Sequence, residues 1–481
     1  MRYSKYPNPN PVNELAKAAA FGRLSRREVI KRGTALGLSS ALMANILKLE
    51  ATGAQGSPSP SADQPAGYSI VPPENVRTDL AGQRINVVGP ATGPGEPFYQ
   101  AVVDAFVEAT GIETNFIRGA ESATDRLSFY LQVFSAQATD IDACEIDVIW
   151  PGIMNPHAVD LKAAFDEQGV EYFERIVSNN TVDDKLVGIP FFTDAGLLYY
   201  RTDLLEQYSL QPPQTWTELE EMATTIQEGE AAGNPSFTGF VWQGAAYEGL
   251  TCNGLEWQFS NNGGTIIEED GSVSVNNENA IAMFEKAKGW VGTISPQGVT
   301  DFMEEDARGI WQGGNSAFMR QWPGAYALGQ APDSVIKDKF DVSPLPKGDA
   351  EGAQNADTLG GWQMMVSTYS EAQEAAIEWA KFATSREIQK SQAIERALLP
   401  TISELYQDPD VLAANPFFER LFDVFSGGAV ARPSTASADL YNDVSTAYFT
   451  TLNQILSGGA DDPAAAVEEL EGQLEDIMSE L

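Results

Sequence analysis

The chain has 481 residues, of which 43% are hydrophobic and nine are tryptophan, and its net charge is −38. The length is enough for two or three domains, and the hydrophobic content predicts a packed protein and excludes a disordered chain. The negative charge argues against nucleic acid as a partner, because the phosphate backbone is itself negative.

Positive charge is concentrated at the N-terminus. Residues 1–50 hold nine Lys or Arg and three Asp or Glu, which leaves 21 basic and 65 acidic residues, a net charge of −44, for residues 51–481. A surface of one sign keeps a protein soluble and repels itself. Two interpretations stay open: an acidic secreted protein, and a protein adapted to high salt.

The basic end has the form of an export signal. SRREVIK (25–31) matches the twin-arginine pattern, and a mildly apolar run, TALGLSSALMANIL, follows it. That run is shorter than the ~20 residues that span a bilayer, so residues 1–54 are predicted to be a targeting segment, cleaved after Ala51 or Ala54. The alternative is an ordinary amphipathic helix. The sequence therefore predicts an extracytoplasmic protein, periplasmic or at the cell surface, exported by the twin-arginine pathway.

The two cysteines, Cys144 and Cys252, are expected to be buried thiols, with one disulfide as the alternative. Neither lies near the signal, so no lipid-attachment cysteine is expected. His157 is the only histidine and there is no Cys-x-x-Cys pair. We therefore expect neither a metal site nor a cofactor.

The first elements after the signal follow a regular order. Residues 55–67 are rich in Ser and Pro and predict an extended linker, which we continue to residue 83. Strand patterns then alternate with helical patterns, a β-α-β-α-β order that predicts parallel strands joined by crossover helices. The strands are expected at 85–89, 114–119 and 146–150, and the helices at 97–111 and 125–138.

The stretch GIPFFTDAGLLYY (188–200) is apolar at nearly every position, which is typical of a fully buried strand. Asp194 lies in its middle. An ionised carboxylate in such a run is costly unless it is paired or hydrogen-bonded. Asp194 is therefore a candidate functional residue, with a salt-bridged structural acid as the alternative.

The remainder of the chain continues to mix the two kinds of element. A capping box from Thr215 to Glu218 predicts the start of a helix that stops at Gly233. Four tryptophans in or beside helical patterns are predicted to be packing residues: Trp216, Trp290, Trp311 and Trp379. Further strands are expected at 239–243, 339–346 and 359–367, and helix-rich stretches at 277–291, 306–322, 370–395 and 464–481.

Six motifs in this order resemble the extracellular solute-binding proteins of ABC importers (family 1), specifically the trehalose/maltose-binding group. They are ATDRLSFYLQ, EIDVIWPG, GIPFFTDAGLLYYRTDLL, GFVWQGAAYEGL, AFMRQWPGAYAL and TLGGW, within residues 84–460. The resemblance implies an α/β fold of the two-lobed, type II periplasmic-binding-protein kind. Crossing segments would join the lobes, with a ligand cleft between them. Lobe 1 would comprise 84–194 and 356–402, and lobe 2 would comprise 195–355 and 403–481.

The resemblance also implies a set of sugar-binding residues. Asp194 and Asp147 would accept hydrogen bonds from sugar hydroxyls, and Arg126 would donate to ring or glycosidic oxygens. Trp322 and Trp362 match sugar-facing tryptophans. Phe192 stands where a relative has tyrosine, which keeps the ring and loses a hydroxyl. The remaining members are Glu96, in a loop after the first strand, Gly361, which would offer its backbone amide, and Arg432, which would bind the second sugar ring.

The implied function is binding without catalysis. The chain would capture an α-linked disaccharide by closure of its lobes, as a monomer, and deliver it to the transmembrane subunits of an ABC permease. No catalytic residue is expected. The competing class is a secreted glycoside hydrolase that uses paired carboxylates such as Asp147 and Asp194. A third possibility is the same fold with another neutral solute.

Overall fold

The computed structural model describes residues 68, 70–90, 95–120, 122–423 and 429–481. The predicted targeting segment and most of the predicted linker therefore lie outside the described residues. The described chain divides into two compact units. Unit 1 contains residues 74–145 and 366–379, and unit 2 contains residues 71–73, 146–365 and 380–481. The lobe boundaries implied by the resemblance stay a prediction.

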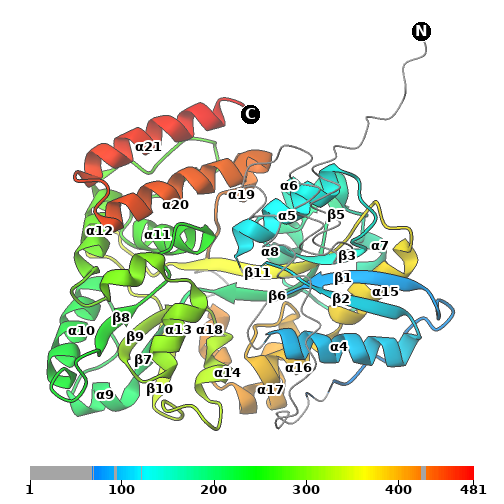
Figure 1. The fold of residues 1–481 in the computed structure, drawn as a ribbon, viewed down its shortest axis with the longest axis horizontal. Helices are drawn as coiled ribbons and strands as arrows, with labels where there is room; N and C mark the ends of the chain where they lie inside the picture. The colour runs from blue at the N-terminus through cyan, green and yellow to red at the C-terminus, as the bar shows by residue number, and fades with distance from the viewer. Residues whose placement is uncertain (1–67, 69, 91–94, 121, 424–428) are drawn as a thin grey trace, which may run out of the picture. The chain divides into compact units, whose positions relative to one another are not determined.

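Unit 1 is built on parallel strands. β1 (Arg84–Gly89) pairs with β2 (Glu113–Arg118) on one side and with β3 (Ala143–Asp147) on the other, both in parallel. Helices α4 (Gly95–Thr110) and α5 (Ala123–Ser135) connect the three strands (Figure 1). The predicted β-α-β-α-β order is confirmed. The third strand begins and ends three residues earlier than predicted, because Val148–Trp150 leave the ladder and lead into a helix at Pro151.

Unit 2 contains a four-stranded sheet in the order β10-β7-β9-β8. β7 pairs antiparallel with β10 and β9, and β8 pairs parallel with β9. Strand β6, which directly precedes β7 in the chain, pairs antiparallel with β11. Strand β11 also pairs in parallel with β12. The strands of unit 2 are β4 (Thr181–Val182), β5 (Lys185–Leu186), β6 (Ile189–Ala195), β7 (Leu197–Arg201), β8 (Thr238–Val241), β9 (Ser316–Gln321), β10 (Phe340–Pro344), β11 (Asp357–Val366) and β12 (Ala429–Val430).

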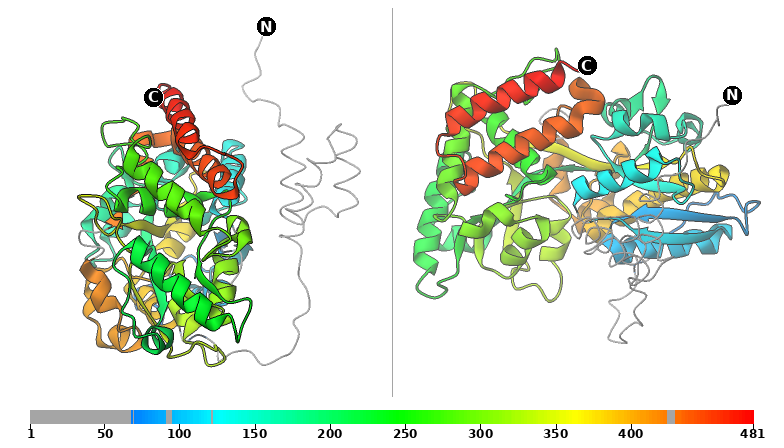
Figure 2. Two further views of the ribbon diagram at one scale, coloured as in Figure 1. Left: turned by 90° about the vertical axis from the view of Figure 1, so that its left-hand side faces the viewer. Right: turned by 45° about the horizontal axis from the view of Figure 1, so that its top comes forward.

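Within unit 2, helices α20 (Tyr441–Ser457) and α21 (Pro463–Met478) run side by side (Figures 1 and 2). α15 (Gln373–Ala383) belongs mostly to unit 1. The α-helices of unit 2 are α6 (Pro151–Met154), α7 (Lys162–Asp166), α8 (Glu174–Asn179), α9 (Thr202–Gln207), α10 (Trp216–Glu230), α11 (Glu248–Ser260), α12 (Glu278–Trp290), α13 (Glu304–Gln312), α14 (Ala325–Gly329), α16 (Arg386–Arg396), α17 (Pro409–Ala414), α18 (Phe418–Asp423), α19 (Ser434–Ser437), α20 (Tyr441–Ser457) and α21 (Pro463–Met478). Short 3-10 turns occupy Asn155–His157, Gln297–Asp301, Ser403–Gln407 and Ala438–Leu440.

Two further local predictions differ from the structure. Residues 306–322 were expected to be a helix-rich stretch, but the helix ends at Gln312 and residues 316–321 form β9. The Gly313–Gly314 pair ends the helix, with Gly314 at φ +76. The buried run 188–200 is two strands, because Gly196 separates β6 from β7.

The tryptophans predicted to pack are all buried. Trp216 and Trp290 lie 5.6 Å apart by ring centroids in the core of unit 2, and Trp379 packs edge-on against Phe106 in unit 1. Trp311 belongs to a second apolar cluster of unit 2. Cys144 and Cys252 are free buried thiols, as expected.

Candidate binding site

Several predicted site residues share one face of the β6–β11 ladder. In the register of this antiparallel pair, Phe192 lies opposite Trp362 and Asp194 lies opposite Gly360. Side chains two residues apart point to the same side of a strand. The ladder therefore presents the Phe192 ring, the Asp194 carboxyl and the Trp362 ring together. Trp362 also packs edge-on against Trp150, with ring centroids 5.5 Å apart.

Close packing requires glycine at residues 360 and 361, which lie opposite Asp194 and Thr193 in the ladder. A Cβ at Gly361 would lie 2.6 Å from the carbonyl oxygen of Phe192, and the residue adopts φ +133. Residues other than glycine rarely adopt that backbone conformation. The carbonyl of Gly361 accepts a hydrogen bond from the Val148 amide at 3.0 Å. The backbone can therefore pass close to its neighbours here only as glycine.

Trp322 follows β9 and lies over Gly360. A Cβ at Gly360 would be 3.0 Å from Cζ3 of the Trp322 ring and 3.0 Å from Cβ of Asp194. The absence of a side chain at residue 360 thus brings the indole ring beside the acid. Trp322 is half-buried, and so are Phe192 and Trp362. The structure therefore gathers three aromatic rings around Asp194.

Asp194 has an unusual electrostatic environment. The residue is only 7% exposed, and its Oδ1 atom is buried without a hydrogen-bond partner among the described residues. Burial raises the pKa of this carboxyl to about 8, while the charge of Arg396 opposes the shift and that of Asp147 adds to it. A buried acid that the surrounding protein does not satisfy is a feature of binding and catalytic sites.

A second charged cluster forms around Arg432, which precedes α19. Nη2 of Arg432 donates to Oδ1 of Asp147 at 2.9 Å, and Nη1 donates to Oε1 of Glu248 at 2.8 Å. Glu248 also accepts hydrogen bonds from the hydroxyls of Tyr441 (2.5 Å) and Ser445 (2.7 Å). Burial raises the pKa of Glu248, and Arg432 counteracts part of that rise. Nε of Arg432 is buried without a partner among the described residues.

Asp147 and Arg432 were predicted separately, and the structure joins them as an ion pair. Asp147 is the last residue of β3, as expected for a ligand-facing acid at the carboxyl end of a parallel strand. Glu248, at the first position of α11, was not assigned a role by the sequence. Its position within a well-matched motif, at a helix N-terminus, was the available signal.

Unit 1 carries the remaining two predicted residues. Arg126 lies in the first turn of α5 as predicted, donates from Nε and Nη2 to the Ala120 carbonyl at 3.1 and 3.0 Å, and lies 3.5 Å from the Glu145 carboxylate. Glu96 was expected in a loop, but it lies in the first turn of α4 and forms an ion pair with Arg118. A carboxylate is favourable at a helix N-terminus because of the helix dipole.

Sequence reasoning also missed a further buried ion pair in unit 2. Arg320 on β9 and Glu256 on α11 have side chains 1% and 0% exposed, and their charged groups are paired. Burial lowers the pKa of Arg320, but the charge of Glu256 and its hydrogen bonds outweigh this, and the net pKa is raised. Arg320 directly follows the apolar residues Ala317–Met319, and Glu256 lies between Leu255 and Trp257, so a charge beside apolar residues was the signal that could have found them.

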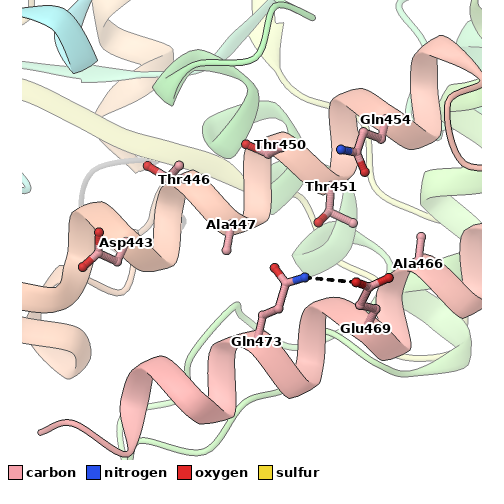
Figure 3. Close-up of a pocket in the computed structure, with 9 residues that line it drawn as sticks. All are labelled: Asp443, Thr446, Ala447, Thr450, Thr451, Gln454, Ala466, Glu469 and Gln473. Atoms are coloured by element: carbon pink, nitrogen blue, oxygen red, sulfur yellow. Dashed lines mark hydrogen bonds between the residues drawn. The ribbon is translucent and has the colours of Figure 1, made fainter.

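A separate groove lies between α20 and α21, with a volume of about 430 Å³ (Figure 3). Its lining is mostly Thr, Gln and acidic side chains and includes no aromatic ring and none of the predicted site residues: Asp443, Thr446, Ala447, Thr450, Thr451, Gln454, Ala466, Glu469 and Gln473. The groove therefore lacks the flat apolar surface on which a sugar ring packs.

No described helix has the length and apolar character to cross a membrane. Within the same residues, no group of three or more His, Cys, Asp or Glu side chains is arranged to hold a metal ion.

Comparison with known proteins identifies the family and the fold. Residues 89–390 match the family described as bacterial extracellular solute-binding protein. A probable ABC transporter-binding protein of Deinococcus radiodurans is 45% identical over 373 residues, which cover 77% of this chain and 88% of the relative. The solved structure of maltose-bound T. maritima MalE3 is 36% identical, with a TM-score of 0.77, and the match covers 82% of this chain and all of that one. A Thermotoga lettingae solute-binding protein bound with α-D-tagatose has a TM-score of 0.73 at 20% identity, covering 82% of this chain and all of the other, and shows the fold alone.

The fold is therefore that of the two-lobed α/β solute-binding proteins of the maltose-binding type. The chain belongs to the bacterial extracellular solute-binding protein family, as its motifs indicated. It is an exported sugar- or solute-binding component of an ABC importer, which delivers its ligand to an ABC permease. Proteins of this class bind without catalysis, so the hydrolase interpretation of the carboxylates is set aside.

Proposed function

We propose that this protein captures an α-linked disaccharide of the trehalose or maltose type. The observation that carries the proposal is the surroundings of Asp194. Its buried Oδ1 lacks a hydrogen-bond partner among the described residues, and the half-buried rings of Phe192, Trp322 and Trp362 gather around it. An acceptor beside flat apolar rings matches a sugar, which has polar hydroxyl edges and an apolar C–H face.

The other predicted residues extend this site in the proposal. Trp322 packs against a sugar ring while Asp194 accepts hydrogen bonds from its hydroxyls. The Asp147–Arg432 pair binds the second ring, and Nε of Arg432, buried and without a partner among the described residues, supplies one donor. Hydrogen bonds to charged groups are worth about 1.5–3 kcal/mol each. The remaining proposed contacts come from Glu96, Arg126 and the amide of Gly361.

A sequence relative supports the choice of sugar. MalE3 of T. maritima, 36% identical to this chain, was solved with maltose bound. Trehalose and maltose both join two glucose units through an α linkage, so the proposal covers both. Another neutral solute on the same fold is the alternative outcome of the test below.

Three features of the biological setting belong to the same proposal. Capture proceeds by closure of two lobes, 84–194 with 356–402 and 195–355 with 403–481, which are joined by crossing segments. The protein acts as a monomer. Its basic N-terminal segment, residues 1–54, directs export through the twin-arginine pathway, on the strength of the SRREVIK motif.

Calorimetric titration of the exported chain with trehalose, maltose, sucrose and glucose tests the proposal. We expect micromolar or tighter binding of one α-linked disaccharide and no comparable binding of glucose. The Asp194→Ala variant is expected to lose about two- to tenfold in affinity near neutral pH, where the raised pKa keeps this carboxyl protonated, since one hydrogen bond to a neutral group is worth about 0.5–1.5 kcal/mol. Trp322→Ala is expected to weaken binding as well.

The matched control is Asp443→Asn, which alters an exposed acid of α20 outside the site. It should bind as the wild type does. Absence of heat with every sugar, from protein shown to be folded, contradicts the proposal and directs the search to other neutral solutes.

A further inference from the structure

A buried ion pair lies directly under Trp322. Nε of Arg320 donates to Oε2 of Glu256 at 2.9 Å, and Nη2 donates to Oε1 at 2.5 Å. Nη1 of the same guanidinium donates to Oε1 of Gln243 at 3.3 Å. Both ends of the planar group are therefore held, and its orientation is fixed.

The guanidinium in turn covers the tryptophan ring. Cζ of Arg320 lies 4.1 Å from the centroid of the Trp322 ring, the geometry of a cation–π contact. The ring nitrogen of Trp322 donates to Oε1 of Glu304 at 3.4 Å, and its backbone carbonyl accepts from the Tyr199 hydroxyl at 2.8 Å. Contacts therefore hold Trp322 at the face of its ring, at its ring nitrogen and at its backbone carbonyl.

The surrounding backbone is shaped around the pair. A Cβ at Gly196 would lie 2.0 Å from Oε1 of Glu256 and 2.5 Å from Nη2 of Arg320. The Thr358 amide also donates to Oε1 of Glu256 at 3.3 Å. Glycine at residue 196 therefore leaves the space that the pair occupies at the junction of β6 and β7.

Stability alone does not account for this arrangement. Removing two charges from water costs about as much as their attraction returns, and apolar replacements of buried pairs are often neutral or stabilising. A site that must present a ring in one orientation gains from such a support, because the ring is ordered before the ligand arrives.

We infer that Arg320, held by Glu256, is a positioning residue that fixes the Trp322 ring for packing against the ligand. The inference rests on the proposed function, since it takes Trp322 as a ligand-contacting residue. Lysine cannot replace Arg320 in this role, because it has neither the bidentate fork nor the planar face.

The test uses the full exported chain labelled with 5-fluorotryptophan. The nine tryptophans give separate fluorine NMR signals, and the Trp322→Phe variant assigns the signal of Trp322. The Arg320→Met/Glu256→Leu double variant removes both charges together and so leaves no unpaired buried charge. We expect the Trp322 signal of the unliganded protein to shift or broaden in this variant and in Arg320→Lys, with most other signals unchanged.

The matched control is Arg201→Met/Asp203→Leu, which removes another ion pair of unit 2. Its Trp322 signal should keep the wild-type position. Should the double variant fail to fold, Glu256→Gln and Arg320→Lys provide the same comparison. An unchanged Trp322 signal in a folded Arg320 variant overturns the inference.

Ligand affinity supplies the second readout. Disaccharide binding is expected to weaken at least tenfold in the Arg320 variant, but not further when Trp322 is already alanine, because the effect passes through the ring. Equal losses in the two backgrounds contradict a positioning role. If wild-type protein binds none of the sugars, the proposed function fails, while the fluorine signals of the unliganded protein still decide whether Arg320 orients Trp322.

Discussion

At the scale of the residue, Asp194 combines features that a purely structural acid would not have. It is buried in an apolar strand, one of its oxygens lacks a partner among the described residues, and its pKa is raised by burial. Each of these features costs stability. Retaining the acid at such a cost is consistent with a role in binding.

The raised pKa predicts how stability changes with pH. The folded protein keeps the Asp194 proton up to a pH of about 8, whereas the unfolded chain loses it near 3.8. Between these values the folded state binds more protons than the unfolded state, so the contribution of Asp194 to the free energy of unfolding falls as pH rises. The Asp194→Asn variant lacks this titrating group, so its free energy of unfolding should rise relative to that of the wild type between pH 5 and pH 8, by roughly 1.4 kcal/mol per pH unit.

Urea denaturation of both proteins at pH 5, 6.5, 8 and 9 measures this difference. The control is again Asp443→Asn, whose curve should run parallel to that of the wild type. Parallel curves for the wild type and Asp194→Asn would show that the carboxyl is solvated or paired.

At the scale of the element, α10 shows a helix start that is encoded locally. The Thr215 hydroxyl accepts a hydrogen bond from the Glu218 amide at 3.1 Å, and the Glu218 carboxylate accepts from the Thr215 amide at 3.3 Å. This is the reciprocal capping box that the sequence predicted. The helix then buries Leu219, Ala223 and Ile226, which have helical spacing, in the core of unit 2.

The Thr215→Ala variant should therefore lower the free energy of unfolding by about 0.5–2 kcal/mol, the usual cost of losing a capping side chain. Thr224→Ala is the matched control, because Thr224 is exposed in the middle of the same helix. Alanine has the higher helix propensity, so the control should be neutral or slightly stabilising. Thermal or urea denaturation measures the free energy of unfolding of both variants. An equal decrease in the two variants would contradict a capping role.

At the scale of the whole molecule, the charge is the dominant feature. Residues 51–481 carry a net charge of −44, and α21 alone places Glu468, Glu475 and Asp476 on its exposed face. Repulsion among such charges destabilises the compact state at low ionic strength, and salt screens it.

The melting temperature of the exported chain is therefore expected to rise from 0.05 M to 1 M NaCl, concentrations at which the Debye length falls from above 10 Å to about 3 Å. The Glu468→Gln/Glu475→Gln/Asp476→Asn variant should show a smaller rise, because it carries less repulsion. An equimolar series with sucrose separates screening from preferential exclusion. A melting temperature that does not depend on salt would show that repulsion among the acidic side chains does not destabilise the folded protein.

Some properties of this protein are determined by the sequence alone. The sequence predicts the β-α-β-α-β order of residues 84–147, the capping box of α10 and the burial of the packing tryptophans, and it contains the six ordered motifs. Each depends on residues close together in the chain, through side-chain periodicity, caps and turns. The motifs also led to the family, which the comparisons confirmed.

Only the tertiary structure decided how distant residues meet. Asp147, Glu248 and Arg432 form one charged cluster although the chain separates them widely. Arg320 and Glu256 pair beneath Trp322, and β9 replaced a predicted helix because pairing with β7 and β8 outweighs local pattern. Glu96 was expected in a loop and lies instead in the first turn of α4. Such contacts arise from strand register and core packing, which are properties of the folded whole, so no local stretch of sequence contains them.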